Sequence, residues 1–149
     1  MSENTHYPLG ENAQDWLLAA SGRKINDITL EAVASGELSS ADLQIKAETL
    51  HAQAEIARQA GFTQLAENLE RAAELTGVPN DELLQMYETL RPGRATHAEM
   101  MALAELLEQR YHAPQNATLV REAATVYLAR GLVKREPPPV SGSEDDPGY

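Results

Sequence analysis

Apolar residues recur every three or four positions along most of the chain, which is the spacing of an amphipathic helix. The pattern predicts helices over residues 27–36, 47–60, 64–76, 80–90, 96–111 and 116–131, with a short extra turn near 39–45. No segment alternates apolar and polar residues as a strand does. The connections are short, so consecutive helices are expected to pack as antiparallel neighbours. The chain is therefore predicted to be all-α, a compact multi-helix domain.

Start and stop signals flank these segments, because short polar side chains can accept bonds from first-turn amides and glycine can end a helix. The predicted N-caps are Thr63, Asn80 and Asn116, and Thr96 with Glu99 is predicted to form a capping box. For the two earlier segments the cap is either Asp27 or Thr29, and either Ser39 or Ser40. The predicted helix-ending glycines are Gly36, Gly61, Gly77 and Gly131.

The apolar stripe of each helix predicts which residues face inward. The stripes are Leu30 and Val33; Leu50, Ala54, Ala57 and Ala60; Leu65, Leu69, Ala72 and Thr76; Leu83, Tyr87 and Leu90; Met100, Leu103, Leu107 and Tyr111; and Val120, Ala123, Ala124 and Tyr127. Alanine forms helices well but removes little apolar surface from water, and only 5% of the residues are aromatic. A core this thin indicates that a partner contributes to stability.

Composition along the chain divides it into three parts. Residues 1–26 show no sustained period and are predicted to be an arm that docks through residues such as Tyr7, Leu9, Trp16 and Leu17. Residues 27–135 form the helical domain. Residues 136–149, EPPPVSGSEDDPGY, are proline-rich and acidic, which predicts a disordered tail.

Net charge and cysteine content exclude several classes of function. The formal charge is −11, which disfavours binding to nucleic acid and to anionic membranes. The chain has no cysteine, so it can form no disulfide, iron–sulfur cluster or thiolate zinc site. No segment has the layout of a signal peptide or a membrane span, so a cytoplasmic location is expected.

Residues 69–88, LERAAELTGVPNDELLQMYE, have the spacing of a helix-turn-helix motif. A helix that reads DNA presents basic and amide side chains to it. Here the second helix carries Asp81, Glu82 and Glu88 and no basic residue. The motif is therefore interpreted as a structural corner between two helices.

Other motifs give no support for catalysis or metal binding. Glu48 and His51 have a metal-ligand spacing, but no second such pair exists, so we favour a surface or packing role. Glu67, Glu70 and Glu74, beside Arg71, are predicted to form a salt-bridged helix surface.

Arg91, Arg94 and Arg121 have two possible roles in an acidic chain. They can pair with acidic neighbours or reach across a subunit interface, and we favour pairing within the chain.

Several blocks in order resemble the small (gamma) subunit of adenosylcobalamin-dependent diol and glycerol dehydratases. They cover nearly all of residues 7–134 and read YPL (7–9), DITLEAVASGEL (27–38), ETLHAQAEIARQAG (48–61), NLERAAELTGVPNDELLQMYETLRPGR (68–94), AEMMALAELLEQRYHA (98–113) and LVREAATVYLAR (119–130).

The resemblance implies a non-catalytic subunit that packs on a large (alpha) subunit in an assembly with medium (beta) subunits, two copies of each. Such enzymes convert 1,2-diols or glycerol to aldehydes with loss of water. By resemblance, adenosylcobalamin and a metal ion belong to the partner subunits, and this chain supplies no catalytic, cofactor or metal ligand. YPL begins at residue 7, without the longer extension of some relatives, so encapsulation in a microcompartment through this chain is not expected.

The expected subunit contacts are Tyr7, Leu9, Trp16, Leu17, Arg91, Arg94 and Arg121. The main alternative is a stand-alone helical adaptor or regulator, and a DNA-binding regulator is a third hypothesis.

Overall fold

The computed structural model describes residues 7–12 and 16–136, and helices dominate them. The elements are α1 (Leu9–Asn12), η1 (Ile25–Asp27), α2 (Leu30–Ala34), η2 (Ser40–Leu43), α3 (Ala47–Gln59), α4 (Thr63–Leu75), α5 (Asn80–Thr89), α6 (His97–Gln109) and α7 (Pro114–Arg130), where η denotes a 3-10 turn. Within the described ranges, extended pairing is limited to one isolated bridge between Leu18 and Lys24. The all-α prediction is confirmed.

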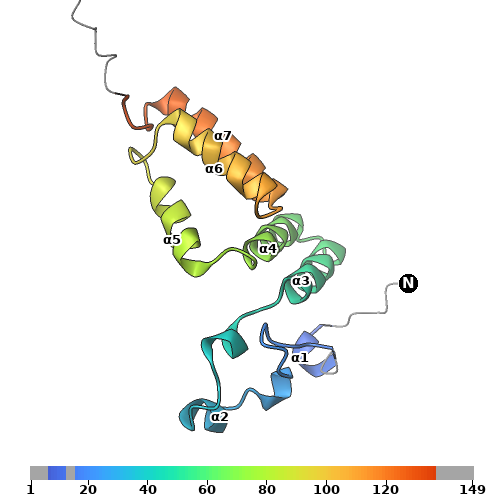
Figure 1. Ribbon diagram of the computed structural model, residues 1–149. Helices are drawn as coiled ribbons and strands as arrows, with labels where there is room; N and C mark the ends of the chain where they lie inside the picture. The colour runs from blue at the N-terminus through green and yellow to red at the C-terminus, as the bar shows by residue number, and fades with distance from the viewer. Residues whose placement is uncertain (1–6, 13–15, 137–149) are drawn as a thin grey trace, which may run out of the picture.

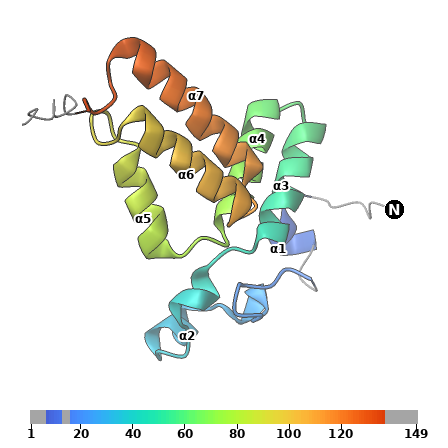
Figure 2. The same ribbon diagram turned by 45° about the horizontal axis from the view of Figure 1, so that its top comes forward.

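The molecule has a helical body and a smaller N-terminal lobe (Figure 1). In the body, α3 packs on α4 and α6 packs on α7, and α4 also contacts α7 (Figure 2). The lobe comprises the described residues up to 46, and its short elements lie below α3 in Figure 1. The prediction of antiparallel neighbours therefore holds for two helix pairs, whereas α5 lies apart from α4 and meets α6 through side chains.

The main core lies where α5, α6 and α7 converge. Its buried members are Val78, Met86, Leu103, Ala104, Leu107, Ala113, Ala117 and Val120, and Leu75, Leu83, Leu90 and Tyr111 pack against them. A separate contact of Ala54, Ala57 and Ala66 joins α3 to α4. Alanine lets these helix backbones approach closely, but each contact removes little apolar surface from water.

Several residues of the predicted stripes are exposed instead of buried. Leu30, Val33, Leu65, Ala72 and Tyr87 all face solvent, as do Ala60 and Thr76. Helical period shows which residues share a face, but it cannot show whether another element covers that face. On α2, and along parts of α4 and α5, no element of the described chain does.

Three predicted N-caps are wrong by one to three residues. Thr63 and Asn80 are already the first residues of α4 and α5, and α7 begins two residues before Asn116. Pro114 explains the early start of α7, because proline lacks the amide hydrogen that the first turn would leave unbonded. Asn116, within the first turn, is buried and bonds to α4.

The other start and stop signals act as predicted. Thr29 accepts a bond from the Ala32 amide at 3.2 Å, and the Thr96–Glu99 capping box is formed. Ser39 is the residue before η2, and Gly131 ends α7 with a positive φ of 67°. After Gly131 the chain turns back, and the Gly93 amide donates to the Leu132 carbonyl at 2.7 Å.

The N-terminal segment docks on the chain's own helices. Leu9 and Leu17 are buried against Ala52 and Ile56 of α3. The tail predicted to be disordered spans residues 136–149, of which 137–149 lie outside the described part, as do residues 1–6 and 13–15. The division into arm, domain and tail stays a prediction. None of the described helices is both long enough and apolar enough to span a lipid bilayer.

Candidate functional site

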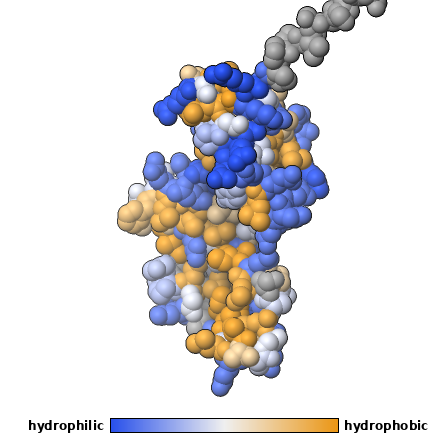
Figure 3. Space-filling model, turned by 90° about the vertical axis from the view of Figure 1, so that its left-hand side faces the viewer, coloured by the Kyte–Doolittle hydropathy of each residue, from blue (hydrophilic) through white to orange (hydrophobic). Residues whose placement is uncertain are grey.

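Bulky apolar side chains gather on the outside of the N-terminal lobe. Five of them, which we call the N-terminal apolar face, are Ile25, Leu30, Val33, Leu43 and Ile45. Leu30 is 89% exposed and Val33 51%. Figure 3 shows hydrophobic surface running through the middle and lower part of the molecule on the side where this lobe and α5 lie. Extensive exposed apolar surface is a feature of interaction sites.

The shortness of α2 explains why Leu30 and Val33 are uncovered. The helix spans five residues, begins after the Thr29 cap and is followed by Gly36 with a φ of 74°. Its two large apolar side chains are three residues apart and so share one face. A helix this short cannot be stable alone, so the loops of the lobe must hold it in place.

Elsewhere in the lobe the surface is hollowed into an apolar cleft of about 210 Å³. Ile25, Leu43 and Ile45 form part of its lining, together with Leu17 and Ile28. The cleft and the exposed side chains suit an apolar side chain from another protein.

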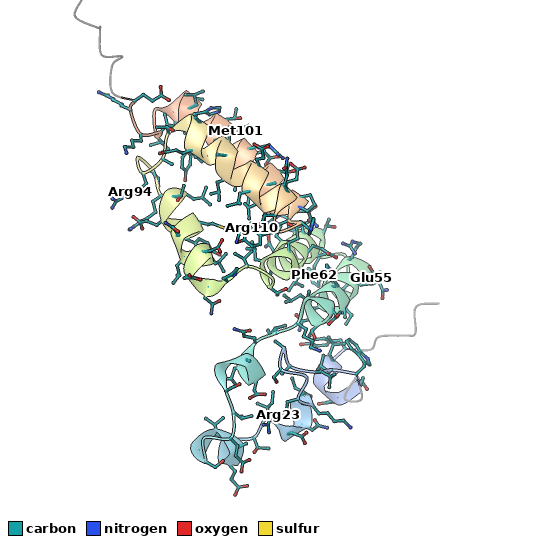
Figure 4. All side chains as sticks on the ribbon, viewed as in Figure 1. Arg23, Glu55, Phe62, Arg94, Met101 and Arg110 are labelled. Carbon is teal, nitrogen blue, oxygen red and sulfur yellow. The ribbon has the colours of Figure 1, made fainter. Side chains whose placement is uncertain are left out.

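Asp42 fixes the shape of the lobe. It is only 6% exposed, and its carboxylate accepts bonds from the Ser21 hydroxyl, the Ser39 amide (2.7 Å) and the Ser39 hydroxyl (2.9 Å). The Arg23 Nε lies 3.3 Å from the same carboxylate, and Arg23 is labelled in the lobe in Figure 4. The Ser21 hydroxyl, followed by the two Ser39 groups and the charge of Arg23, lowers the pKa of Asp42 to about 2.

The N-terminal apolar face has unpaired acidic neighbours. Asp27, Glu31 and Glu37 lie within the same stretch of chain, are exposed, and their carboxylates form no ion pair among the described residues. An apolar surface with acidic groups beside it favours a partner that presents apolar and basic groups.

The seven predicted contact residues divide into three groups. Tyr7 (76% exposed) and Trp16 (45%) are accessible, whereas Leu9 and Leu17 are buried within this chain. The arginines pair internally, Arg91 and Arg94 with Glu88 and Arg121 with Glu108, as we favoured. Figure 4 shows Arg94 at the turn between α5 and α6. A subunit contact through any of the seven stays a prediction.

His51 is engaged with a carboxylate on the neighbouring helix. Its Nδ1 lies 2.6 Å from Glu70, which also lies 3.5 Å from Arg58. Glu48, the other member of the sequence motif, does not take part in this cluster. Across the described residues, no group of three or more histidine or acidic side chains is arranged to hold a metal ion.

The predicted acidic row with Arg71 is wrong in its pairing. Glu70 contacts α3, and Glu74 accepts bonds at 3.0 Å from the amides of Gln115 and Asn116 at the start of α7. Arg71 instead donates to the side chain of Asn68.

Sequence reasoning missed the N-terminal apolar face because it placed Leu30 and Val33 inside. The signal that could have revealed it is the small number of residues between the cap Thr29 and the stop Gly36, which is enough for less than two helical turns. A helix of that length has only a small face with which to reach a core.

Comparison with known proteins gives two kinds of match. The model of the family described as "Dehydratase small subunit" matches residues 2–134. The chain is 48% identical over 130 residues to the propanediol dehydratase small subunit of Citrobacter freundii, covering 87% of this chain and 76% of that protein. It is 46% identical over 128 residues to the protein of the same name from Salmonella typhimurium, covering 86% and 74%.

Proposed function

The chain belongs to the dehydratase small-subunit family, and we propose that it is a non-catalytic subunit of a propanediol or glycerol dehydratase that stabilises the assembly by packing on the large catalytic subunit. The two relatives described above support the reaction, since both are named as propanediol dehydratase small subunits.

The observation that carries the structural part of the proposal is the N-terminal apolar face. Five bulky apolar side chains are exposed on a lobe whose loops are joined by the hydrogen bonds of Asp42. Full burial of a side chain such as leucine or valine contributes about 1.5–3 kcal/mol. A partner that covers this face therefore stabilises the assembly, and by mass action it also stabilises the fold of the small subunit.

In this proposal the partners are large (alpha) and medium (beta) subunits, two copies of each, in the cytoplasm. The assembly converts 1,2-diols or glycerol to aldehydes with loss of water, and adenosylcobalamin and a metal ion reside in the partner subunits. Among the described residues, His51 is paired with Glu70, and no group of three or more histidine or acidic side chains is arranged to hold a metal ion.

Co-expression with the large and medium subunits tests the proposal. Tagged chain is expected to retain both subunits and to raise the dehydratase activity or solubility recovered with them. A chain that never retains a large subunit, and that melts cooperatively as a monomer, would instead be a stand-alone helical adaptor.

Substitution of the face tests the mode of packing. Leu30→Gln with Val33→Gln is expected to weaken retention of the large subunit about tenfold or more, since about 1.4 kcal/mol corresponds to a factor of ten. Leu128→Gln is the matched control, because Leu128 is 54% exposed and lies near the end of α7, away from the lobe. Equal retention by all three proteins contradicts packing through this face.

A further inference from the structure

A second apolar groove lies in the helical body, between α4, α5 and α7. Its volume is about 290 Å³. Leu75 of α4, Leu83 and Tyr87 of α5, and Leu119 of α7 line it, and Met86 is buried at its base. In Figures 1 and 2, α5 lies apart from α4, and residues of both helices line the groove.

The edges of this groove are apolar and open. Tyr87 is 60% exposed and Leu119 is 46% exposed, on two different helices. An aromatic and an aliphatic side chain that line one hollow are typical of a surface that receives a side chain from a partner.

Arg71 adds a charge to a lining that is otherwise apolar apart from Asn68 and Asn116. Its guanidinium donates to the Asn68 side chain and forms no ion pair with any described carboxylate. Six other arginines differ, since Arg23, Arg58, Arg91, Arg94, Arg110 and Arg121 all pair with carboxylates. Arg130 and Arg135 are also unpaired in the described part, but neither lines this groove.

The position of Glu74 explains why this carboxylate does not pair with Arg71. Glu74 lies three residues further along α4, at the spacing of a helical ion pair. Its two oxygens are occupied by the Gln115 and Asn116 amides and by the Asn116 side chain, at 2.7–3.0 Å. Glu67, four residues before Arg71, forms no ion pair with it either, so the guanidinium beside the groove is available to a carboxylate of a partner.

The groove is continuous with a wider hollow that leads toward the N-terminal lobe. Leu75, Leu83 and Tyr87 line both, and the wider hollow extends to Ile45 of the N-terminal apolar face. One partner surface can therefore cover both regions.

We propose that this groove receives a segment of a partner dehydratase subunit that inserts a bulky apolar side chain between Tyr87 and Leu119 and places a carboxylate against Arg71. The inference rests on the proposed function. A guanidinium binds a carboxylate through two parallel hydrogen bonds, and water exclusion by the surrounding apolar side chains strengthens the pair.

The first experiment identifies the occupant in the assembled complex. A photo-crosslinking phenylalanine analogue replaces Tyr87, the complex is irradiated, and the linked peptide is identified by mass spectrometry. A peptide of a partner subunit with an aspartate or glutamate near a bulky apolar residue is expected. Linkage to residues 137–149 of the same chain, linkage to a second copy, or absence of any linked peptide overturns the proposal.

The second experiment tests the charge. Arg71→Glu is expected to weaken retention of the partner at least tenfold, whereas Arg130→Glu, with the same change in charge at an exposed arginine outside the groove, changes it less than twofold. Arg71→Lys keeps the charge without the two-pronged geometry and is expected to have an intermediate effect. Equal retention by the Arg71→Glu and Arg130→Glu proteins contradicts the proposal.

The two proposals fail in different ways. If the unmodified chain retains no partner subunit, the proposed function fails. If it retains the partner while the crosslink and the Arg71 variants give the contradicting results, only the groove assignment fails. Thermal melts of the free variants check that each is folded. The Arg71 variants are expected to fold, because Asn116 bonds to the backbone carbonyl of Arg71 and not to its side chain.

Discussion

Glu74 belongs to α4, but its carboxylate serves the start of α7. Two backbone amides and the Asn116 side chain donate to it at 2.7–3.0 Å. An acidic group at a helix N-terminus satisfies amides that have no partner in the helix and interacts favourably with the helix dipole. This residue therefore acts as a cap supplied from another helix.

Glu74→Ala is expected to destabilise the free chain by about 1–3 kcal/mol, because the backbone amide of the buried Asn116 loses its acceptor. Urea denaturation followed by circular dichroism measures the loss. Glu67→Ala is the control, since Glu67 is exposed on the same helix and has no side-chain partner in the described structure. A similar, small loss for both variants would show that the cap contributes little.

Asp42 makes the lobe sensitive to acid. Its pKa is lowered from the ordinary 3.8 to about 2, because the folded state donates bonds to the charged form. A group with a lowered folded pKa stabilises the fold above its unfolded value, and that contribution is lost as the pH falls toward the folded value. The stabilisation by Asp42 is thus complete above about pH 4 and declines between about pH 4 and pH 2.

The sole tryptophan, Trp16, lies in the lobe and reports this change. Its fluorescence is expected to show a transition as the pH is lowered through this range, and Asp42→Asn is expected to weaken the lobe at pH 7 and reduce the transition. Asp27→Asn serves for comparison, because the Asp27 carboxylate forms no ion pair in the described structure. Identical acid titrations of the three proteins would rule out a role for Asp42.

At the scale of elements, the contacts of α3 with α4 show how alanine determines packing. Ala54 and Ala66 are fully buried where these helices meet. The sequence pattern of α3 predicted that Ala54 faces inward. It missed Ala66 of α4, because the apolar pattern of α4 is dominated by Leu65 and Leu69. Leu65 is exposed and Leu69 packs at the contact.

Ala66→Leu is expected to cost about 1–3 kcal/mol of stability, because the added methyl groups have no space between the helices. Ala98→Leu, at an exposed position in α6, is expected to have little effect. Chemical denaturation of both variants distinguishes them, and equal midpoints would mean that the two helices separate easily.

Helix ends show the limit of reading elements from sequence. The Thr96–Glu99 capping box was predictable because both partners are local. The starts of α4, α5 and α7 were misplaced, because each begins without a side-chain cap of its own and α7 is capped by Glu74 of α4. A contact between residues more than forty positions apart leaves no local signal.

At the scale of the whole molecule, the described chain leaves two apolar regions uncovered, the N-terminal apolar face and the groove beside Arg71. Exposed apolar area of this extent lowers the net stability of a chain in isolation relative to the same chain in a complex. The small alanine contacts of the body point in the same direction.

Assembly with partner subunits is therefore expected to raise the unfolding temperature of this chain. Free partner at about one hundred times its dissociation constant adds about 2.7 kcal/mol to the free energy of unfolding. For a domain of this size, that raises the unfolding temperature by roughly 5–10 °C. Differential scanning fluorimetry measures the rise. Comparing the complex that retains Trp16 with one that carries Trp16→Phe separates the signal of this chain from that of its partners. The Leu30→Gln, Val33→Gln double variant is expected to show a smaller rise, and an equal rise would contradict burial of the face.

The sequence alone determined the helical class, the identity of most helices, the absence of thiol chemistry and the resemblance to dehydratase small subunits. These depend on local period, on composition and on the order of residues, all of which can be read along one dimension. Only the tertiary structure decided which apolar stripes are covered, where Glu74 and Asp42 bond, and that Arg71 lies unpaired beside a groove. Burial and pairing depend on which distant segments meet, and neighbouring residues in a sequence carry no record of that.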